Sequence, residues 1–230
     1  DILQYSSDTS GEPTQGGAAV AFIVSQNPRL LNIEPISSIY SEEIMDFWRP
    51  IDKKEAIFDG KLSAYQYLRS LDIGFHDYLR QTGLSKADID YFCFHSPFGK
   101  MVRKAAKQIG YADVENLLKY NSVIGNSCSA SLYVSFISLL DHQMEDMSEK
   151  RIGFFSYGSG SVAEFFTGRV VPGYQKVLSS EANKAFLADR EEISFEEYEA
   201  FRKSASSYQG YENAGNLKFV GVIDDKRIYG

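Results

Sequence analysis

Residues 89–97 read Ile89-Asp90-Tyr91-Phe92-Cys93-Phe94-His95-Ser96-Pro97. The aromatic and β-branched residues favour a strand, and Pro97 marks its end because proline has no N–H to donate to a sheet. Residues 100–109 then contain good helix formers and no breaker before Gly110. The sequence therefore predicts a strand that delivers His95 to the edge of a sheet, followed by a helix.

The same alternation of strand and helix runs through most of the chain. Upstream, residues 18–24 form an apolar run that predicts a buried strand, and residues 62–79 have the spacing of an amphipathic helix ended by Gly83. Downstream, further elements are expected: short helices at 113–120, a helix buried on all sides at 132–140, strands at 151–157 and 162–171 joined by Gly158-Ser159-Gly160, a helix with a capping box at Ser194 and Glu197, and strands at 219–223 and 227–229 that meet at 224–226.

This order predicts an α/β fold, in which a mixed β-sheet is covered by helices on both faces. The 230 residues are 43% hydrophobic and 14% aromatic, which is enough for one substantial core. No internal repeat or linker divides the chain, so residues 1–230 are expected to form one domain.

Composition also excludes several classes of function. No apolar run has the length of a membrane-spanning helix, and the polar start of the chain lacks the features of a signal peptide, so we expect a soluble cytoplasmic protein that does not bind membranes. The net charge of −7 disfavours nucleic-acid binding. Cys93 and Cys128 have no metal-ligand spacing, and we expect both to be buried free thiols, with Cys128 a small residue rather than a nucleophile.

His95 is the best catalytic candidate, because open α/β sheets bind ligands at the carboxyl ends of their strands and an imidazole transfers protons near neutral pH. A structural, capping histidine is the alternative. His76 and His142 lie on predicted helices beside acidic residues and are expected to be surface histidines.

A basic face follows His95. Lys100, Arg103, Lys104 and Lys107 are three, four and seven residues apart, which places them on one side of the predicted helix. Such a face can bind phosphates, with Lys100 and Lys104 as the expected contacts, or it can simply be solvated.

Two polar groups could contact an acyl group. Asn126 precedes the buried helix, and its amide could hydrogen-bond a thioester or enolate, although asparagine also caps helices. In Gly158-Ser159-Gly160 the glycines would let a backbone N–H approach an oxyanion, although the segment could be a plain hairpin turn.

Four motifs together resemble the hydroxymethylglutaryl-CoA synthases: residues 11–16 (Gly-Glu-Pro-Thr-Gln-Gly), 46–50 (Asp-Phe-Trp-Arg-Pro), 94–101 (Phe-His-Ser-Pro-Phe-Gly-Lys-Met) and 155–160 (Phe-Ser-Tyr-Gly-Ser-Gly). The resemblance spans essentially the whole chain. It implies the thiolase fold, in which two similar halves form a five-layered α/β/α/β/α sandwich, and the chain resembles the C-terminal half. The family condenses acetyl-CoA with acetoacetyl-CoA and needs no cofactor.

The resemblance also implies residue roles. His95 matches the histidine that positions the acetoacetyl substrate, Asn126 the asparagine near the acyl group and Ser159 the oxyanion-hole donor. Pro97, Phe98, Lys100 and Lys104 fall where the family binds its acyl-CoA substrates. The segment Ser127-Cys128-Ser129 replaces an aromatic residue and a threonine found in relatives, which affects substrate specificity.

The family's nucleophilic cysteine and general-base glutamate belong to the first half, so the chain alone is expected to be inactive until that N-terminal half joins it. The complete enzyme would be a homodimer serving the mevalonate pathway to isoprenoids. Two alternatives stay open: a polyketide-branching synthase that takes substrates from an acyl carrier protein, and a non-catalytic thiolase-like partner subunit.

Overall fold

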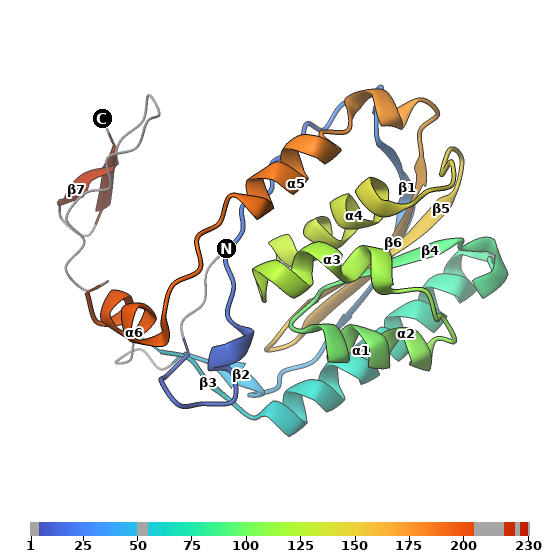
Figure 1. Ribbon diagram of the computed structural model, residues 1–230. Coiled ribbons are helices and arrows are strands. Elements are labelled where there is room, and N and C mark those ends of the chain that lie inside the picture. Colours follow the sequence, from blue (N-terminus) through green and yellow to red (C-terminus); the bar gives the residue numbers. More distant parts are fainter. Residues whose placement is uncertain (1–4, 50–54, 205–218, 224–225, 230) are drawn as a thin grey trace. The chain divides into compact units, whose positions relative to one another are not determined.

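The computed structural model describes residues 5–49, 55–204, 219–223 and 226–229. The chain packs as two compact units, Asp1–Asn183 and Lys184–Gly230, and the first contains the main sheet and the helices around it (Figure 1). The expectation that residues 1–230 form a single domain stays a prediction.

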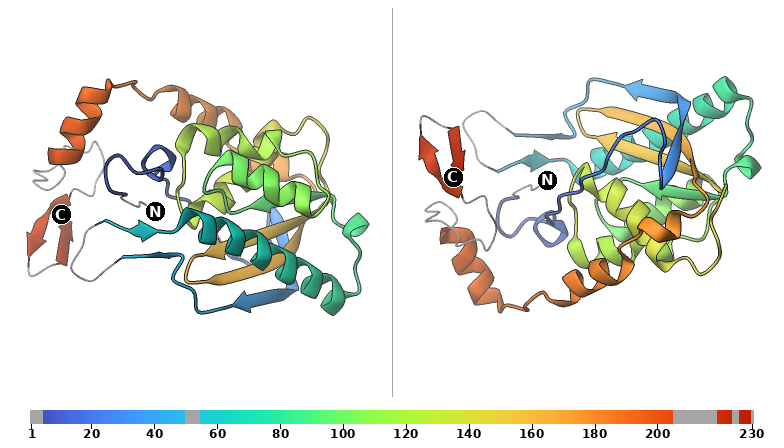
Figure 2. Two further views of the ribbon diagram at one scale, coloured as in Figure 1. Left: turned by 90° about the horizontal axis from the view of Figure 1, so that it is seen from below. Right: turned by 90° about the horizontal axis from the view of Figure 1, so that it is seen from above.

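Four strands form the main sheet. They are β1 (Leu31–Ser41), β4 (Tyr91–Phe94), β5 (Arg151–Gly158) and β6 (Val162–Val170), in the spatial order β1-β6-β5-β4. β4 runs parallel to β5, whereas β5, β6 and β1 pair antiparallel. The predicted mixed sheet is confirmed, and Figure 2 shows β1 at its outer edge beside β6.

Helices cover both faces of this sheet, as predicted. Phe154 of β5 packs edge-on against Phe136 of α4 (Ala130–His142), with ring centroids 5.3 Å apart. The next residue, Phe155, packs against Tyr67 of α1 (Gly60–Thr82) at 5.2 Å. Because successive side chains of a strand point to opposite faces, α1 and α4 lie on opposite sides of the sheet.

Helix α1 begins and ends as its sequence indicates. The Asp59 carboxylate accepts hydrogen bonds from the N–H groups of Lys61 and Leu62, both at 3.0 Å, and Gly83 ends the helix with φ of 69°. The apolar spacing of the sequence places Tyr65 on the buried face of this helix, but Tyr65 is 61% exposed and Tyr67 is buried. The buried residues are Gln66, Tyr67, Ser70, Leu71, Gly74, Phe75 and Tyr78.

The helices after β4 also match the prediction. They are α2 (Gly99–Gln108) and α3 (Glu115–Ile124), and α4 is buried on nearly every side. Serines on α4 let it approach other backbones: the Ser135 hydroxyl donates to the Phe94 carbonyl at 3.2 Å, and the Ser138 hydroxyl donates to the Asn116 carbonyl at 2.6 Å. α4 therefore packs tightly although its buried surface includes hydroxyl groups.

The strand predicted at residues 18–24 is wrong. These residues have no regular secondary structure, and Ile23 and Val24 are 86% and 83% exposed. An apolar run becomes a buried strand only when neighbouring strands pair with it, and none of the described sheets includes this segment. The first strand is β1 instead, which the sequence analysis missed because Pro35 and several polar residues interrupt its pattern at an irregularity between Ile33 and Ser37.

The remaining elements are short. β2 (Phe47–Trp48) pairs antiparallel with β3 (Ile57–Phe58), and 3₁₀ turns span Glu12–Thr14, Lys86–Asp88 and Tyr174–Val177.

The last part of the chain, where it is described, has two helices and two strands. The sequence analysis did not predict α5 (Ser180–Ala188) as a separate helix, whereas α6 (Phe195–Ser204) has the expected capping box. β7 (Phe219–Ile223) pairs with β8 (Lys226–Tyr229). The expected turn at residues 224–225 lies outside the described residues. No helix in the described part of the chain is both long and apolar enough to span a bilayer.

Substitution Phe165→Ala tests the core between the sheet and α1. The Phe165 ring is fully buried and contacts the rings of Phe75, Tyr78 and Phe92. We expect a loss of about 3–5 kcal/mol in the free energy of unfolding, because the surrounding rings cannot collapse into the cavity. Urea unfolding measures the change. The control Phe186→Ala, at a side chain that is 76% exposed, should change stability by less than about 1 kcal/mol; equal losses would contradict this description of the core.

Candidate active site

His95 directly follows β4, and main-chain and side-chain hydrogen bonds fix its backbone. Its N–H donates to the Phe155 carbonyl of β5 at 2.8 Å, which extends the parallel pairing by one residue. Its carbonyl accepts a hydrogen bond from the Tyr67 hydroxyl of α1 at 2.7 Å. Burial raises the pKa of that hydroxyl, so Tyr67 remains a neutral donor. The histidine is thus held from both the sheet and the helix.

The imidazole is oriented through Nδ1. This nitrogen lies 3.1 Å from the Cys128 carbonyl oxygen and 2.9 Å from the Ser131 hydroxyl. A carbonyl oxygen can only accept, so Nδ1 carries the hydrogen when the ring is neutral. Nε2 is then left as an acceptor for whatever occupies the space in front of the ring.

The protonation state of His95 follows from its surroundings. Burial lowers the pKa of its imidazole from the usual 6.5 to about 4, and the hydrogen bond to the Cys128 carbonyl opposes part of this shift. The imidazole of this chain is therefore neutral at pH 7. A negative charge that forms beside Nε2 would raise this pKa and favour the protonated, donating form.

Asn126 is held between two chain segments. Its backbone N–H donates to the Thr14 carbonyl at 2.8 Å, and its side-chain Oδ1 accepts from the Cys128 N–H at 3.0 Å. This turn precedes α4, which begins after Ser129, so Asn126 does not cap the helix itself. With Oδ1 occupied, the amide acts through its Nδ2 donor, which contacts the Tyr5 hydroxyl.

The turn Gly158-Ser159-Gly160 joins β5 to β6, as predicted, and it is anchored from below. The fully buried Asp46 carboxylate accepts hydrogen bonds from the Gly160 N–H at 3.0 Å and from the Tyr157 hydroxyl at 3.1 Å. In the described part of the chain no group accepts the Ser159 N–H. That N–H is therefore available to a ligand.

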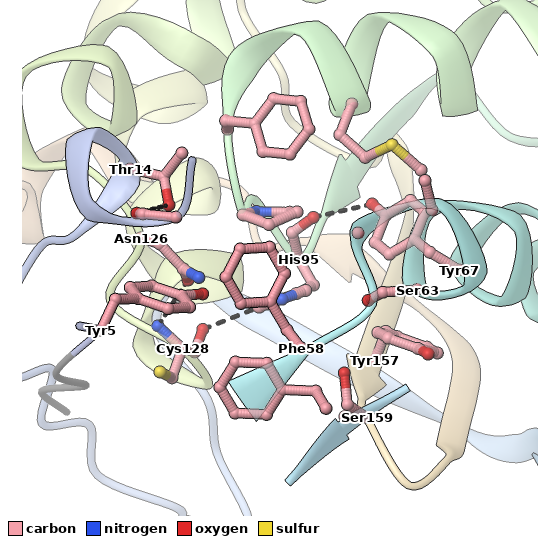
Figure 3. Close-up of a pocket in the computed structure, with 18 of the residues that line it drawn as sticks. Tyr5, Thr14, Phe58, Ser63, Tyr67, His95, Asn126, Cys128, Tyr157 and Ser159 are labelled. Atoms are coloured by element: carbon pink, nitrogen blue, oxygen red, sulfur yellow. Dashed lines mark hydrogen bonds between the residues drawn. The ribbon is translucent and has the colours of Figure 1, made fainter. Parts of the chain in front are cut away.

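These groups surround one cavity of about 620 Å³. Figure 3 shows His95 in its middle, with Asn126 and Cys128 on one side and Tyr157 and Ser159 on the other. Pro97, Phe98 and Met101 also line it. Aromatic side chains form most of the remaining wall: Tyr5, Phe47, Phe58, Tyr67 and Tyr157. The structure thus gathers His95, Asn126, Ser159, Pro97 and Phe98 around a single apolar space.

Two predicted binding residues lie apart from the cavity lining. Lys100 and Lys104 are on the exposed side of α2 and make no ion pair or hydrogen bond within the described residues. Arg103, on the same side, pairs with Glu115 at 2.9 Å. The basic face therefore begins next to the cavity residue Phe98, at the rim of the site.

Two expectations need correction. Cys128 is only half-buried, it lines the cavity, and its backbone has φ of 51°, a conformation that serves to aim its carbonyl at His95. Burial raises the pKa of its thiol, which agrees with the expectation that it is no nucleophile. His142 is half-buried rather than a surface residue, because its ring packs edge-on against Tyr120 at 4.9 Å. His76 is exposed as expected.

Sequence reasoning missed several residues of the site. Asp46 belongs to a quoted motif, but its role as an anchor of a turn more than a hundred residues away has no local signal. Tyr67 could have been found as the residue four positions before Leu71 on the buried face of α1. Tyr5 and Phe58 meet edge-on at 5.3 Å across a long sequence separation, which local patterns do not reveal.

The mixed sheet with helices on both faces, and a histidine at the end of its parallel strand, define a domain of the thiolase fold. The profile of the family described as "Hydroxymethylglutaryl-coenzyme A synthase C terminal" matches residues 31–123 and 114–215. The chain belongs to the hydroxymethylglutaryl-CoA synthase family.

Individual relatives agree with this assignment. The chain is 39% identical over 211 residues to hydroxymethylglutaryl-CoA synthase of Enterococcus faecalis, which covers 87% of this chain and 55% of the relative. It is 34% identical over 212 residues to the polyketide biosynthesis 3-hydroxy-3-methylglutaryl-ACP synthase PksG of Bacillus subtilis (strain 168), covering 84% and 50%. A solved structure of MvaS in complex with 3-hydroxy-3-methylglutaryl coenzyme A superposes with a TM-score of 0.85 at 33% identity, covering 100% of this chain and 65% of that chain. The chain spans about half the length of the curated relatives it matches.

The lowered pKa of His95 predicts a loss of stability in mild acid. The unfolded chain binds a proton near pH 6.5 and the folded chain only near pH 4, so this contribution is complete above pH 6.5 and is lost as the pH falls toward 4. We expect wild type to lose up to about 3 kcal/mol more than His95→Gln over that interval. Urea unfolding of both proteins at several pH values measures this difference. Because the other titrating groups are the same in both proteins, their contributions cancel when the two are compared. Parallel curves would contradict the assignment of a neutral imidazole to the folded chain.

Proposed function

We propose that the chain is the part of a hydroxymethylglutaryl-CoA synthase that holds the acetoacetyl substrate while acetyl-CoA and acetoacetyl-CoA condense. The observation that carries this proposal is the arrangement of His95, Asn126 and Ser159 around one cavity. The rest of the cavity lining is mainly aromatic and apolar, with a few hydroxyl groups, which suits a short acyl chain with a reactive carbonyl. Both substrates are thioesters, and the reaction needs no metal or other cofactor.

His95 has the role of binding the ketone of the acetoacetyl group. The neutral ring offers Nε2 only as an acceptor, so it binds the ketone oxygen productively once it is protonated. Attack of an acetyl carbanion on the ketone places negative charge on that oxygen, and this charge raises the pKa of the nearby imidazole. As its pKa rises, Nε2 takes up a proton from solvent, and it gives this proton to the alkoxide oxygen, which becomes the hydroxyl of the product while the ring returns to its neutral form.

Asn126 and the Ser159 turn have the role of binding the thioester oxygens. The Asn126 Nδ2 donor and the Ser159 N–H come from opposite walls of the cavity, and both are fixed before a ligand binds. Donors held in place in an apolar site stabilise an oxyanion without reorganising. The two fixed donors thus favour a reaction at a carbonyl group over binding alone.

The nucleophile and the base belong to a complementary half of the enzyme. Burial raises the pKa of both thiols of this chain, and Cys93 is fully buried, so neither offers a thiolate at neutral pH. An uncovered apolar surface supports a partner half: Ile33 and Ile39 of β1 and Val162 of β6 are 61%, 67% and 56% exposed. They lie on the α4 face of the sheet, as does the exposed segment at residues 22–24, whose Phe22 ring is 5.1 Å from Tyr133 of α4. The chain without that half is inactive in this proposal.

The proposal extends to the assembly and setting of the complete enzyme. Its two halves form the five-layered thiolase sandwich, and the complete enzyme is a cytoplasmic homodimer. It acts in the mevalonate pathway to isoprenoids. The sequence resemblance supports these points, and the E. faecalis relative bears the name of the same synthase.

A second candidate is a synthase of polyketide branching, which takes one or both acyl groups from an acyl carrier protein. The similarity to PksG, named as an ACP synthase, favours this candidate. The basic side of α2 at the rim of the cavity suits the phosphates of CoA and the acidic surface of a carrier equally. A non-catalytic partner subunit is the third reading; it requires that no product forms when the complementary half is supplied.

Substitution His95→Ala tests the main role. In the complete enzyme, condensation should fall by at least about 100-fold because the ketone loses its proton donor. Acetyl transfer to the cysteine of the other half should persist, because that step does not use this imidazole. Radiolabelled acetyl incorporation and product formation, measured on one preparation, separate the two steps. Unchanged turnover would remove His95 from the mechanism.

The double substitution Lys100→Ala with Lys104→Ala distinguishes the two donors. If free CoA is the ligand, its Kd should rise about tenfold, since two phosphate contacts are lost, and the effect should shrink at high salt. Lys107→Ala, one turn further along the same helix side, serves as the matched control and should change Kd by less than about twofold. Unchanged CoA binding together with weaker binding of a holo-carrier protein would favour the ACP synthase instead.

A further inference from the structure

The turn that carries Ser159 is held by more than Asp46. Beyond β1, the Glu42 N–H and carbonyl exchange hydrogen bonds with the Ser161 carbonyl and N–H at 3.0 and 2.6 Å, and the Ile44 N–H donates to the Gly160 carbonyl at 2.8 Å. All of these contacts are made by the backbone of one neighbouring segment. Among the described side chains of α1, Gln66 alone donates a hydrogen bond to this turn, at Ser161.

Gln66 makes this contact from a fully buried position. Its Nε2 donates to the Ser161 hydroxyl at 3.0 Å and to the Glu42 carboxylate at 3.2 Å. The carboxylate can only accept, which fixes the orientation of the amide. Oε1 is then buried without a partner in the described part of the chain. Burying an unsatisfied oxygen costs free energy, so the position is not explained by stability alone.

A chain of neighbouring polar groups leads from Gln66 to the cavity. The Ser161 hydroxyl, which accepts from Gln66, and the Ser159 side chain both lie close to the Tyr157 hydroxyl. The Tyr157 hydroxyl in turn donates to Asp46, which holds the Gly160 N–H. Gln66 is therefore connected to the Ser159 turn through Ser161, next to the cavity residue Tyr157.

Gln66 also precedes Tyr67, whose hydroxyl holds the His95 carbonyl. One turn of α1 consequently contacts both sides of the site: Tyr67 the histidine and Gln66 the oxyanion turn. We propose that Gln66 is a positioning residue, which sets the distance between the Ser159 N–H and His95 by tying the turn to α1. This inference rests on the proposed function for its catalytic meaning, but the mechanical link is independent of it.

Amide hydrogen exchange of the full chain tests the link directly. In Gln66→Leu, the Gly160 and Ser161 amides should exchange about fivefold to tenfold faster, as expected for loss of one buried hydrogen bond. Ser161→Ala removes the same bond from the other end and should have the same effect, and the double variant should exchange no faster than either single one. The Ser161→Ala arm decides the question if Gln66→Leu fails to fold.

Ser70→Ala is the matched control, because Ser70 is one turn further along α1, is fully buried, and has a hydroxyl without a described partner. It should leave the turn amides within about twofold of wild type. Unchanged exchange at Gly160 and Ser161 in both test variants overturns the proposal. Equal acceleration throughout β5 and α1 also overturns it, because that result means general destabilisation.

Ligand affinity is a second measurement, and it should not change if Gln66 had only a structural role. Acetoacetyl-CoA carries a thioester carbonyl for the Ser159 N–H, whereas CoA has none. Gln66→Leu should weaken acetoacetyl-CoA binding by about fivefold and leave CoA binding within about twofold, equivalent to one misplaced hydrogen bond. Equal weakening of both overturns the positioning role. If wild type binds neither ligand, the proposed function fails, and the exchange experiment still decides whether Gln66 holds the turn.

Discussion

The hydrogen bond from the His95 N–H to the Phe155 carbonyl is the constraint on which the site depends. It is the last link of the parallel β4–β5 pair, and it joins the strand that carries the histidine to the strand that carries the Ser159 turn. Three residues after Phe155, β5 ends at Gly158 and the turn begins. Since both strands lie in a close-packed core, the distance across the cavity is set by the sheet rather than by the loops.

The third side of the cavity depends on a close approach between two backbones. The N-terminal segment at residues 14–16 lies against residues 124–126, where a Cβ on Gly16 would meet the Ile124 carbonyl oxygen at 2.3 Å. Gly125 has φ of 85°, and a Cβ there would meet the Gln15 carbonyl oxygen at 2.4 Å. Only glycine fits at both positions, so the glycines of the Gly-Glu-Pro-Thr-Gln-Gly motif and of Gly125-Asn126 together allow Thr14 to fix Asn126.

Elements with a clear local signal could be predicted, and those that depend on distant partners could not. Helix α1 begins after Asp59 and ends at Gly83, as the chemistry of these two residues predicts. The strand that leads to His95 ends at Phe94, shortly before Pro97. The apolar run at 18–24 failed as a strand because backbone pairing is a property of two segments, not one. β1 was missed for the opposite reason: pairing with β6 tolerates Pro35 at an irregularity that no pattern reveals. In the same way, the motifs pointed to His95, Asn126 and Ser159, but the residues behind them, Asp46 and Gln66, act over long sequence separations.

The neutral state of His95 suits the proposed role of the site, which is to bind a ketone and then a negative charge. A permanently charged imidazole in this apolar cavity would need a buried counter-charge, and among the described residues the nearest hydrogen-bond partners of the ring are a carbonyl and a hydroxyl. Without a carboxylate beside it, the ring is charged only when charge develops on the ligand. The imidazole is then a strong proton donor when the alkoxide forms and a weak one while the ketone is intact. Its interaction therefore stabilises the transition state more than the bound substrate. A carboxylate next to Nδ1 would raise the pKa of the ring and stabilise its charge before the reaction, which would remove this difference.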